Sequence, residues 1–365
     1  MTRGTVSEIS LSALHHNLKI VRQIADKRTV IAVVKADAYG HGSVRISSEL
    51  VYAGISHLAV AYTEEAKVLR DAGIAAKILV LFDHSEIADY FEYDLVPVIY
   101  DIDTAVAFSR EAKKRGKKVR IHLKIDTGMG RIGFMPGTAV AASAFISDLE
   151  GIELEGLLSH FSDADSDDRS HALKQLEVFS NIRSAIQQMT GRPLLAHMAN
   201  SGALLSLKDG LLDAVRPGLA LYGYSPFHEN YGLRPVMKIK TRVLSIRNLP
   251  AGTPVSYSRS FITKRESRIA VVPVGYADGY NRLFSNNADM LVRGSRAPVV
   301  GRICMDLTMI DVTSVGDISE GEEVVLLGQQ GDDMITAKEL ASKINTIPYE
   351  VITSLGGRAR KEYTD

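Results

Sequence analysis

Between about residues 28 and 225 the chain alternates short apolar runs with longer amphipathic stretches. Most of the runs are continuous, without a polar residue at every second position, and this pattern is typical of strands covered on both faces. The stretches between the runs have the period of helices, and two of them end at Gly54 and Gly73, where we expect left-handed C-caps. The predicted strands cover residues 29–36, 57–62, 77–82, 95–100, 119–126, 154–161, 194–200 and 212–218.

Eight buried strands separated by helices over roughly 200 residues favour a (β/α)8 barrel, and a doubly wound open sheet is the alternative that periodicity allows. Polar residues at the predicted strand ends favour the barrel, because barrel active sites form where the carboxyl ends of several strands converge. These residues are Lys35, Lys124, His160, Asn200 and Arg216.

After about residue 230 the pattern changes to strand-like segments separated by turn residues, with few helix-like stretches before residues 335–344. The fold class is therefore α/β, with an N-terminal TIM-type barrel over residues 1–230 and a mostly β domain over residues 231–365. The length of 365 residues also fits two domains better than one.

Equal numbers of basic and acidic residues, 43 of each, argue against a nucleic-acid-binding surface. We interpret the basic run at residues 113–118 as a solvated helix end, because cations stabilise a helix C-terminus. The single cysteine, Cys304, excludes an intrachain disulfide and a cysteine metal cluster, and we expect a buried small side chain there. The chain has neither a signal-peptide-like start nor a membrane-spanning apolar run, which predicts a cytoplasmic protein.

The segment AVVKADAYGHG, residues 32–42, carries the strongest chemical signal. Lys35 ends an apolar strand, where an amine can lose its proton readily and attack an aldehyde. Lysines at strand ends often extend to water instead, and on its own Lys35 fits that description as well. Tyr39, Gly40 and Gly42 follow at once and offer a hydroxyl and a closely approaching backbone beside the lysine.

AVVKADAYGHG resembles the lysine motif of the alanine racemases, and further segments resemble this family in the same order across both expected domains. These segments are KIDTGMGRIG (124–133), EGLLSHF (155–161), HMANSGAL (197–204), VRPGLALYG (215–223), VSYSRSF (255–261), VGYADGY (274–280) and VGRICMDLTMIDV (300–312). The resemblance implies an isomerase that interconverts L-alanine and D-alanine with pyridoxal 5'-phosphate, and supplies D-alanine for peptidoglycan.

By this resemblance Lys35 holds the cofactor as a Schiff base and serves as the base on one face of the substrate. Tyr276 serves the other face, since racemisation needs a proton to leave one face and return to the other. Tyrosine has an ordinary pKa of about 10, so such a base needs nearby charge or donors, for which the family uses residues that match His160 and Arg216. The family brings Tyr276 from a partner subunit, which implies a homodimer with shared active sites.

The resemblance implies binding roles as well. Arg216 bonds the pyridine nitrogen, which stays unprotonated because an arginine keeps its own protons. Arg131 and the Met305 backbone amide hold the substrate carboxylate. Lys124 matches a lysine often found carbamylated, whose negative charge would orient Arg131. The residues that match phosphate contacts are Tyr39, Ser201, Gly218 and Leu219.

One departure from the family concerns the C-terminal end. Many relatives carry a tyrosine that contacts the phosphate and lines the entrance, and counting from Tyr349 places Gly357 at that position. Arg358 or Tyr363 is a possible substitute for the missing ring. This departure leaves a serine or broad-specificity amino-acid racemase as an alternative.

Two further alternatives fit less well. A decarboxylase of the same architecture does not need Tyr276, and a non-enzymatic carrier of pyridoxal phosphate resembles the barrel alone. The histidine spacing matches no metal motif such as HExxH, so we expect no catalytic metal. Residues 1–10 are expected to pair with the second domain, as they do in the family.

Overall fold

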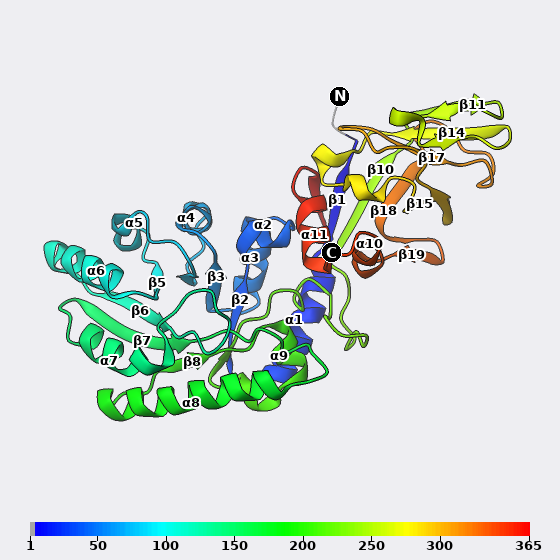
Figure 1. Ribbon diagram of the computed structural model, residues 1–365. Helices are drawn as coiled ribbons and strands as arrows, with labels where there is room; N and C mark the ends of the chain where they lie inside the picture. The colour runs from blue at the N-terminus through cyan, green and yellow to red at the C-terminus, as the bar shows by residue number, and fades with distance from the viewer. Residues whose placement is uncertain (1–3) are drawn as a thin grey trace. The chain divides into compact units, whose positions relative to one another are not determined.

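The computed structural model describes residues 4–365, which form two compact units (Figure 1). The barrel unit is coloured from blue to green in Figure 1, and most of the β-rich unit is coloured from yellow to red. The barrel unit consists of Leu14–Ala38 and Ser43–Arg234. The β-rich unit consists of the described chain up to Ala13, the short segment Tyr39–Gly42 and Pro235–Asp365.

Eight parallel strands close the barrel in the order β2 to β9, and β9 pairs with β2 to complete the ring. Each strand overlaps the apolar run expected for it, so the predicted (β/α)8 barrel is confirmed. The strands are β2 (Thr29–Val33), β3 (His57–Val60), β4 (Lys77–Val80), β5 (Val96–Ile99), β6 (Val119–Lys124), β7 (Ile152–Leu158), β8 (Leu195–His197) and β9 (Ala214–Val215).

A helix follows each strand from β2 to β8, and Figure 1 shows these helices around the outside of the strands. Gly54 and Gly73 have φ of 87° and 82°, which confirms the left-handed ends expected there. Asp101 caps α6 (Ile102–Arg115) by accepting from the Thr104 amide, and left-handed Gly116 ends this helix directly after its basic last turn. The helices are α3 (Ser43–Tyr52), α4 (Thr63–Asp71), α5 (Ile87–Glu92), α6 (Ile102–Arg115), α7 (Pro136–Ser147), α8 (Ser170–Thr190) and α9 (Ser201–Ser206).

The β-rich unit is built on a sheet with the strand order β16-β15-β18-β10-β1-β20, to which β19 adds beside β18. The first strand, β1, pairs antiparallel with β10 and parallel with β20, so both ends of the chain contribute to this sheet. A second sheet has the order β11-β14-β17, and β12 pairs with β13. The strands are β1 (Val6–Ser10), β10 (Met237–Arg242), β11 (Ser245–Leu249), β12 (Pro254–Val255), β13 (Phe261–Ile262), β14 (Ser267–Val272), β15 (Asp289–Val292), β16 (Ser295–Pro298), β17 (Thr308–Asp311), β18 (Glu323–Gln330), β19 (Asp333–Ile335) and β20 (Arg360–Thr364).

Two helices lie near the end of the chain, α10 (Ala337–Lys343) and α11 (Pro348–Gly356). The first was expected, whereas α11 was not. Its sequence carries the signals of a helix, since Pro348 opens it and Val351, Ile352 and Leu355 form one buried face. The long helix that precedes the barrel is α1 (Leu11–Ala25). Across residues 4–365, no helix combines the length and apolar character needed to span a membrane.

Candidate active site

The polar side chains expected at the strand ends gather at one end of the barrel. Lys124 is the last residue of β6, Arg216 follows β9 directly, and Lys35 and His160 lie two residues beyond β2 and β7. Asn200 follows β8 and caps α9 by accepting from the Ala203 amide. Because all eight strands are parallel, these positions share the C-terminal end of the barrel, where active sites of this fold form.

Four cations stand at this end, and their charges act on one another. The Lys35 ammonium and the Arg131 guanidinium each lie 5.4 Å from the centre of the Phe82 ring, a cation–π distance. Burial, together with the charges of Arg216 and Arg131, lowers the pKa of Lys124 to about 7. Burial lowers the pKa of Arg216 to about 9, which still leaves its guanidinium charged at neutral pH. Lys124 and Arg216 are buried, and such an excess of positive charge is suited to anionic ligands.

Lys35 has the properties of a reactive amine. Burial lowers its pKa, and the Arg131 and Arg216 charges act in the same direction, while Glu65 opposes them. The Glu65 carboxylate accepts from the Ala36 amide at 2.5 Å and from the Ala61 amide at 2.7 Å. Glu65 therefore anchors the backbone beside Lys35, a role that its place near the start of α4 did not reveal.

The backbone that carries Lys35 is unusual. In the segment α2 (Lys35–Tyr39), the residues from Ala36 to Tyr39 have φ between 52° and 54°, a left-handed turn made without glycine. The Asp37 carboxylate accepts from the Ser43 amide at 2.7 Å and closes the turn. Tyr39 ends the turn and belongs to the β-rich unit, where its buried ring lies 6.0 Å from the ring of Tyr349.

Arg216 is held by acceptors on every side. Its Nη1 donates to the His197 carbonyl oxygen at 2.8 Å and lies 2.6 Å from His197 Nδ1. Its Nη2 donates to the carbonyl oxygens of Ser159 at 2.6 Å and Met198 at 3.1 Å, and lies 3.2 Å from His160 Nδ1. The structure thus brings together Arg216 and His160, and burial and the Arg216 charge lower the pKa of His160 well below its usual range.

Ser201 and the turn after Arg216 form a second cluster. Ser201 Oγ accepts from the amides of Gly218 and Ala220, each at 3.1 Å. Ser201 opens α9, and Leu219 is fully buried in the turn after Arg216. A hydroxyl, a helix start and a tight turn therefore meet where the sequence placed the phosphate contacts.

The loop that carries Arg131 is organised by Asp126, which sequence reasoning missed. Asp126 Oδ1 accepts from the amides of Gly128, Met129 and Gly130 at 2.8–3.1 Å, and Oδ2 accepts from the Arg131 amide at 2.9 Å. The D-T-G-x-G pattern was a possible signal, since a carboxylate followed by glycines favours such a turn.

Tyr276 and Met305 lie in neighbouring loops of the β-rich unit. The Tyr276 amide donates to the Cys304 carbonyl at 3.1 Å, and the Ala277 amide donates to the Met305 carbonyl at 3.0 Å. A Cβ on Gly275 would lie 2.2 Å from the Met305 oxygen, so only glycine lets the two loops approach this closely. The Tyr276 and Met305 side chains are 43% and 55% exposed, which leaves both available to a ligand or a partner.

The Gly357 position is open. If a Cβ were added to Gly357, the nearest atom to it would be the Ser354 carbonyl oxygen, 3.5 Å away. Of the two proposed substitutes, Arg358 donates to the Ala277 carbonyl at 2.8 Å, next to Tyr276, whereas Tyr363 donates to the His41 carbonyl at 3.2 Å.

Cys304 is half-buried, and the expectation of a buried side chain is wrong. It lies next to the exposed Met305, on a loop where its sulfur makes weak contacts of 3.7 Å with Ser256 Oγ and the Arg302 carbonyl. A side chain in an exposed loop has too few neighbours to be enclosed.

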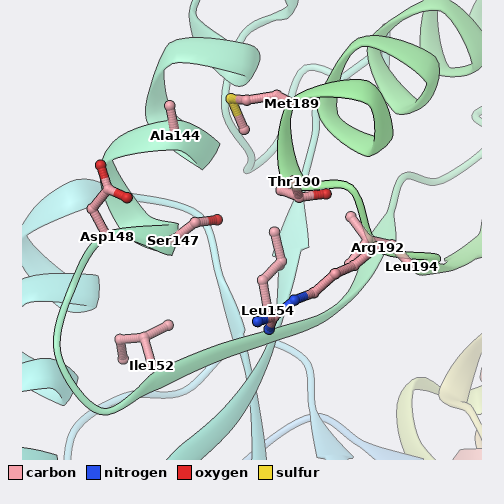
Figure 2. A pocket seen from close by; sticks show the side chains of 9 residues that line it. All are labelled: Ala144, Ser147, Asp148, Ile152, Leu154, Met189, Thr190, Arg192 and Leu194. Carbon is pink, nitrogen blue, oxygen red and sulfur yellow. The ribbon is translucent and has the colours of Figure 1, made fainter.

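A cavity of about 330 Å³ lies elsewhere on the barrel unit (Figure 2). Figure 2 shows it between the ends of α7 and α8, with Ile152 at the start of β7 and Leu194 just before β8. These positions are at the N-terminal end of the barrel strands, opposite the cations. Since conserved chemistry in this fold belongs to the other end, the cavity is not the candidate active site.

Comparison with known proteins shows the family of the chain. Residues 9–226 match the family model of the alanine racemase N-terminal domain, and residues 236–363 match that of the C-terminal domain. The fold and these matches define an isomerase with a barrel domain and a β-rich domain. The chain belongs to the alanine racemase family.

Individual relatives cover nearly the whole chain. The alanine racemase of Thermodesulfovibrio yellowstonii is 47% identical over 100% of this chain and 98% of the relative. The solved alanine racemase of Clostridium difficile 630 is 34% identical with a TM-score of 0.93, over 100% of this chain and 96% of that one. The alanine racemase of Bartonella henselae, solved with covalently bound pyridoxal phosphate, is 30% identical with a TM-score of 0.89 over 99% of both chains.

Proposed function

We propose that this protein interconverts L-alanine and D-alanine with pyridoxal 5'-phosphate, and that Lys35 holds the cofactor. The observation that carries the proposal is the set of three basic side chains, Lys124, Arg131 and Arg216, around a lysine of lowered pKa at the C-terminal end of the barrel. A lowered pKa raises the fraction of Lys35 in the neutral form that attack on an aldehyde requires.

The donor set fits this cofactor at both of its ends. Ser201, Gly218 and Leu219 supply a hydroxyl and a tight turn for the phosphate, and Tyr39 is the fourth proposed contact. Arg216 is a fixed cation that would face the pyridine nitrogen, and His160 stands beside it. When bound, pyridoxal phosphate delocalises the electron pair left at the substrate Cα after proton removal.

Racemisation removes the Cα proton from one face of the substrate and returns a proton to the other face, so it needs a base on each face. Lys35 Nζ is the proposed base on one face, and the Tyr276 hydroxyl is the proposed base on the other. Arg131 and the Met305 amide would hold the substrate carboxylate, and the fork of Arg131 suits such an anion. We propose a homodimer in which Tyr276 and Met305 complete the site of the partner subunit, which is compatible with their exposure.

Lys124 is the proposed carbamate. Its pKa of about 7 leaves much of the amine neutral, and a neutral amine adds carbon dioxide to form an N–CO2⁻ group with release of one proton. The neutral amine would thereby become an anion, and the fraction of Lys124 that is protonated would first lose one more proton to reach the same state. An anion beside Arg216 and Arg131 would relieve their repulsion and orient Arg131 toward the substrate.

The open position at Gly357 favours a second candidate, a racemase that also accepts serine. A site without the family's tyrosine would have a wider entrance. The proposed protein acts in the cytoplasm and supplies D-alanine for peptidoglycan.

The test is a visible spectrum of the purified protein with pyridoxal 5'-phosphate, followed by chiral analysis after incubation with L-alanine and, separately, L-serine. We expect a band that borohydride removes and D-alanine formed faster than D-serine. Lys35→Ala should abolish both, while Lys174→Ala, at an exposed lysine of α8, should change neither. A band without alanine racemisation would shift the proposal to another substrate or to a carrier, and no band at all would end it.

A further inference from the structure

A line of polar side chains runs from Arg216 into the barrel. Arg216 Nη1 lies 2.6 Å from His197 Nδ1, and His197 Nε2 lies 2.8 Å from His122 Nδ1. His122 Nε2 lies 3.7 Å from Glu155 Oε2, and Glu155 Oε1 accepts from the Lys77 ammonium. These five residues, Arg216, His197, His122, Glu155 and Lys77, are called the interior chain.

Arg216 fixes the direction of the hydrogen bonds. A guanidinium has only donors, so His197 Nδ1 must accept and carries no proton. The neutral His197 ring then has its proton on Nε2 and donates it to His122 Nδ1. His122 must in turn be protonated on Nε2, the atom that faces Glu155. The interior chain therefore runs one way, from a cation that can only donate to a carboxylate that can only accept.

Two features of β7 put Glu155 in this place. Strands β6 and β7 pair Ile121 with Leu154 and then His122 with Gly156, so Glu155 is the extra residue of a β-bulge. A bulge re-aims a side chain out of the regular alternation of a strand. A Cβ on Gly156 would lie 2.5 Å from His122 Nδ1, so glycine at this position leaves the room that the imidazole occupies.

Burial and charge keep the interior chain in this state. Burial lowers the pKa of His122 against the opposing effect of Glu155, and burial lowers the pKa of His197; the Arg216 charge acts in the same direction as burial on both. The His122 N–H and the Lys77 ammonium lower the pKa of Glu155 to about 2 against the effect of its burial. Within residues 4–365, His122 Nε2 and Glu155 Oε2 are buried without a hydrogen-bond partner, and they lie 3.7 Å from each other.

We propose that His197, His122 and Glu155 are positioning residues that lock one set of tautomers and thereby hold the Arg216 guanidinium in place. The three backbone carbonyls around Arg216 fix its position, and the His197 acceptor fixes the rotation of its planar fork. This inference rests on the proposed function for what Arg216 binds, whereas the tautomers follow from the contacts alone.

The tautomers are tested by nitrogen-15 NMR of protein labelled at its histidine rings, before and after loading with pyridoxal 5'-phosphate. We expect His122 and His197 to stay neutral from about pH 6 to about pH 9, with the proton on Nε2 and none on Nδ1. Loss of a signal in His122→Gln or His197→Asn assigns each ring. A proton on Nδ1 of either ring, or a ring that titrates in this range, would overturn the one-way chain.

The positioning role is tested with matched pairs in the cofactor-loaded protein. Asparagine and leucine have nearly the same size, but only asparagine offers an acceptor near the place of Nδ1. His197→Leu should lower kcat by about tenfold or more with a smaller change in KM, because it removes one charge-assisted hydrogen bond to Arg216. His197→Asn should keep most of the wild-type kcat, because it keeps an acceptor for that bond. Glu155→Met and Glu155→Gln form the same comparison at the other end of the interior chain, since only glutamine keeps an acceptor. Glu153→Gln is the control: Glu153 is exposed on the same strand, and this substitution should leave kcat unchanged.

The outcomes separate positioning from packing. If His197→Leu and His197→Asn lose the same activity and the same thermal stability, the interior chain only fills the barrel and the positioning role is wrong. If His197→Leu does not fold, the Glu155 pair and the wild-type NMR spectrum still decide the question. If the wild-type protein binds no cofactor but shows the expected tautomers, the proposed function fails and the interior chain stands.

Discussion

Removal of the Asp126 carboxylate is expected to loosen the loop that presents Arg131. One oxygen accepts from the amides of Gly128, Met129 and Gly130, and the other accepts from the Arg131 amide. The glycines at 128 and 130 have φ of 135° and 68°, conformations that the loop keeps only while its amides converge on the carboxylate. Asp126→Ala removes all four bonds, and Asp126→Asn removes one.

The magnitude follows from these bonds. A hydrogen bond to a charged group contributes about 1.5–3 kcal/mol, but Gly128, Gly130 and Arg131 are exposed, so water replaces part of what is lost. We therefore expect Asp126→Ala to lower the free energy of unfolding by about 2–4 kcal/mol, a large effect for one substitution. In Asp126→Asn the new amide NH2 group faces the Arg131 N–H, so two donors meet and one hydrogen bond is lost. We expect this to lower the free energy of unfolding by about 1–2 kcal/mol.

The pH dependence gives an internal check. Burial alone would raise the pKa of Asp126, but its backbone donors lower it below the usual value. The stabilisation by the carboxylate is therefore fully present above the unfolded-state pKa of about 3.9, and it is lost as the pH falls through the folded-state pKa. The stability gap between wild type and Asp126→Asn should be constant near neutral pH and shrink in acid.

Urea unfolding followed by circular dichroism measures the global effect, since the chain has no tryptophan for fluorescence. Hydrogen exchange of residues 128–131, followed by mass spectrometry, measures the loop itself. Asp167→Ala is the control, because Asp167 is an exposed carboxylate of the barrel unit. The reasoning is refuted if Asp126→Ala unfolds at the same urea concentration as the control and its loop amides exchange no faster.

Three further substitutions test the proposed site. Tyr276→Phe should keep the visible band and slow exchange of the α-proton for deuterium from one enantiomer of alanine more than from the other; loss of the band would make Tyr276 a cofactor contact instead. Lys124→Met should stabilise the protein by as much as about 5 kcal/mol below pH 7 and by nothing near pH 10.5, because a buried amine with a lowered pKa of about 7 disfavours folding while it is charged; if the substitution instead lowers the stability when bicarbonate is present, Lys124 of the wild type carries the carbamate. Gly357→Tyr should lower the rate with serine relative to alanine, with Gly137→Ala, at an open position of α7, as the control, and an unchanged ratio would exclude Gly357 from substrate selection.

The barrel could be predicted because its strands are buried on both faces and therefore appear as continuous apolar runs. The polar ends of those strands could be predicted for the same reason, since a lysine or arginine after an apolar run interrupts the pattern. Lys35, Lys124 and Arg216 are accordingly found where expected. The segment Pro348–Gly356 was missed as a helix although its apolar spacing fits one, because strand-like segments dominate that part of the chain.

The contacts around the site could not be predicted in the same way. Phe82 and Glu65 look like ordinary residues at a strand end and a helix start, and only barrel closure brings them to the cations. His122 and His197 lie on β6 and β8, separated in the sheet by β7, and nothing in their sequence spacing indicates that their rings meet. Such pairs depend on register and on the bulge in β7, which a single sequence does not specify.

The turn after Lys35 shows why local preference fails at such a site. Left-handed backbone costs a non-glycine residue about 1 kcal/mol or more, so four such residues in succession oppose any prediction from propensity. The surrounding contacts supply what the turn lacks: Glu65 accepts from the Ala36 amide, Asp37 accepts from the Ser43 amide, and Ala38 is fully buried. Backbone strain of this kind lowers the stability of the fold, and it is typical of functional sites, where the position of a side chain is more important than that stability. The side chain that this turn begins with is Lys35, which is the reason to expect that relaxing the turn would cost activity before it cost the fold.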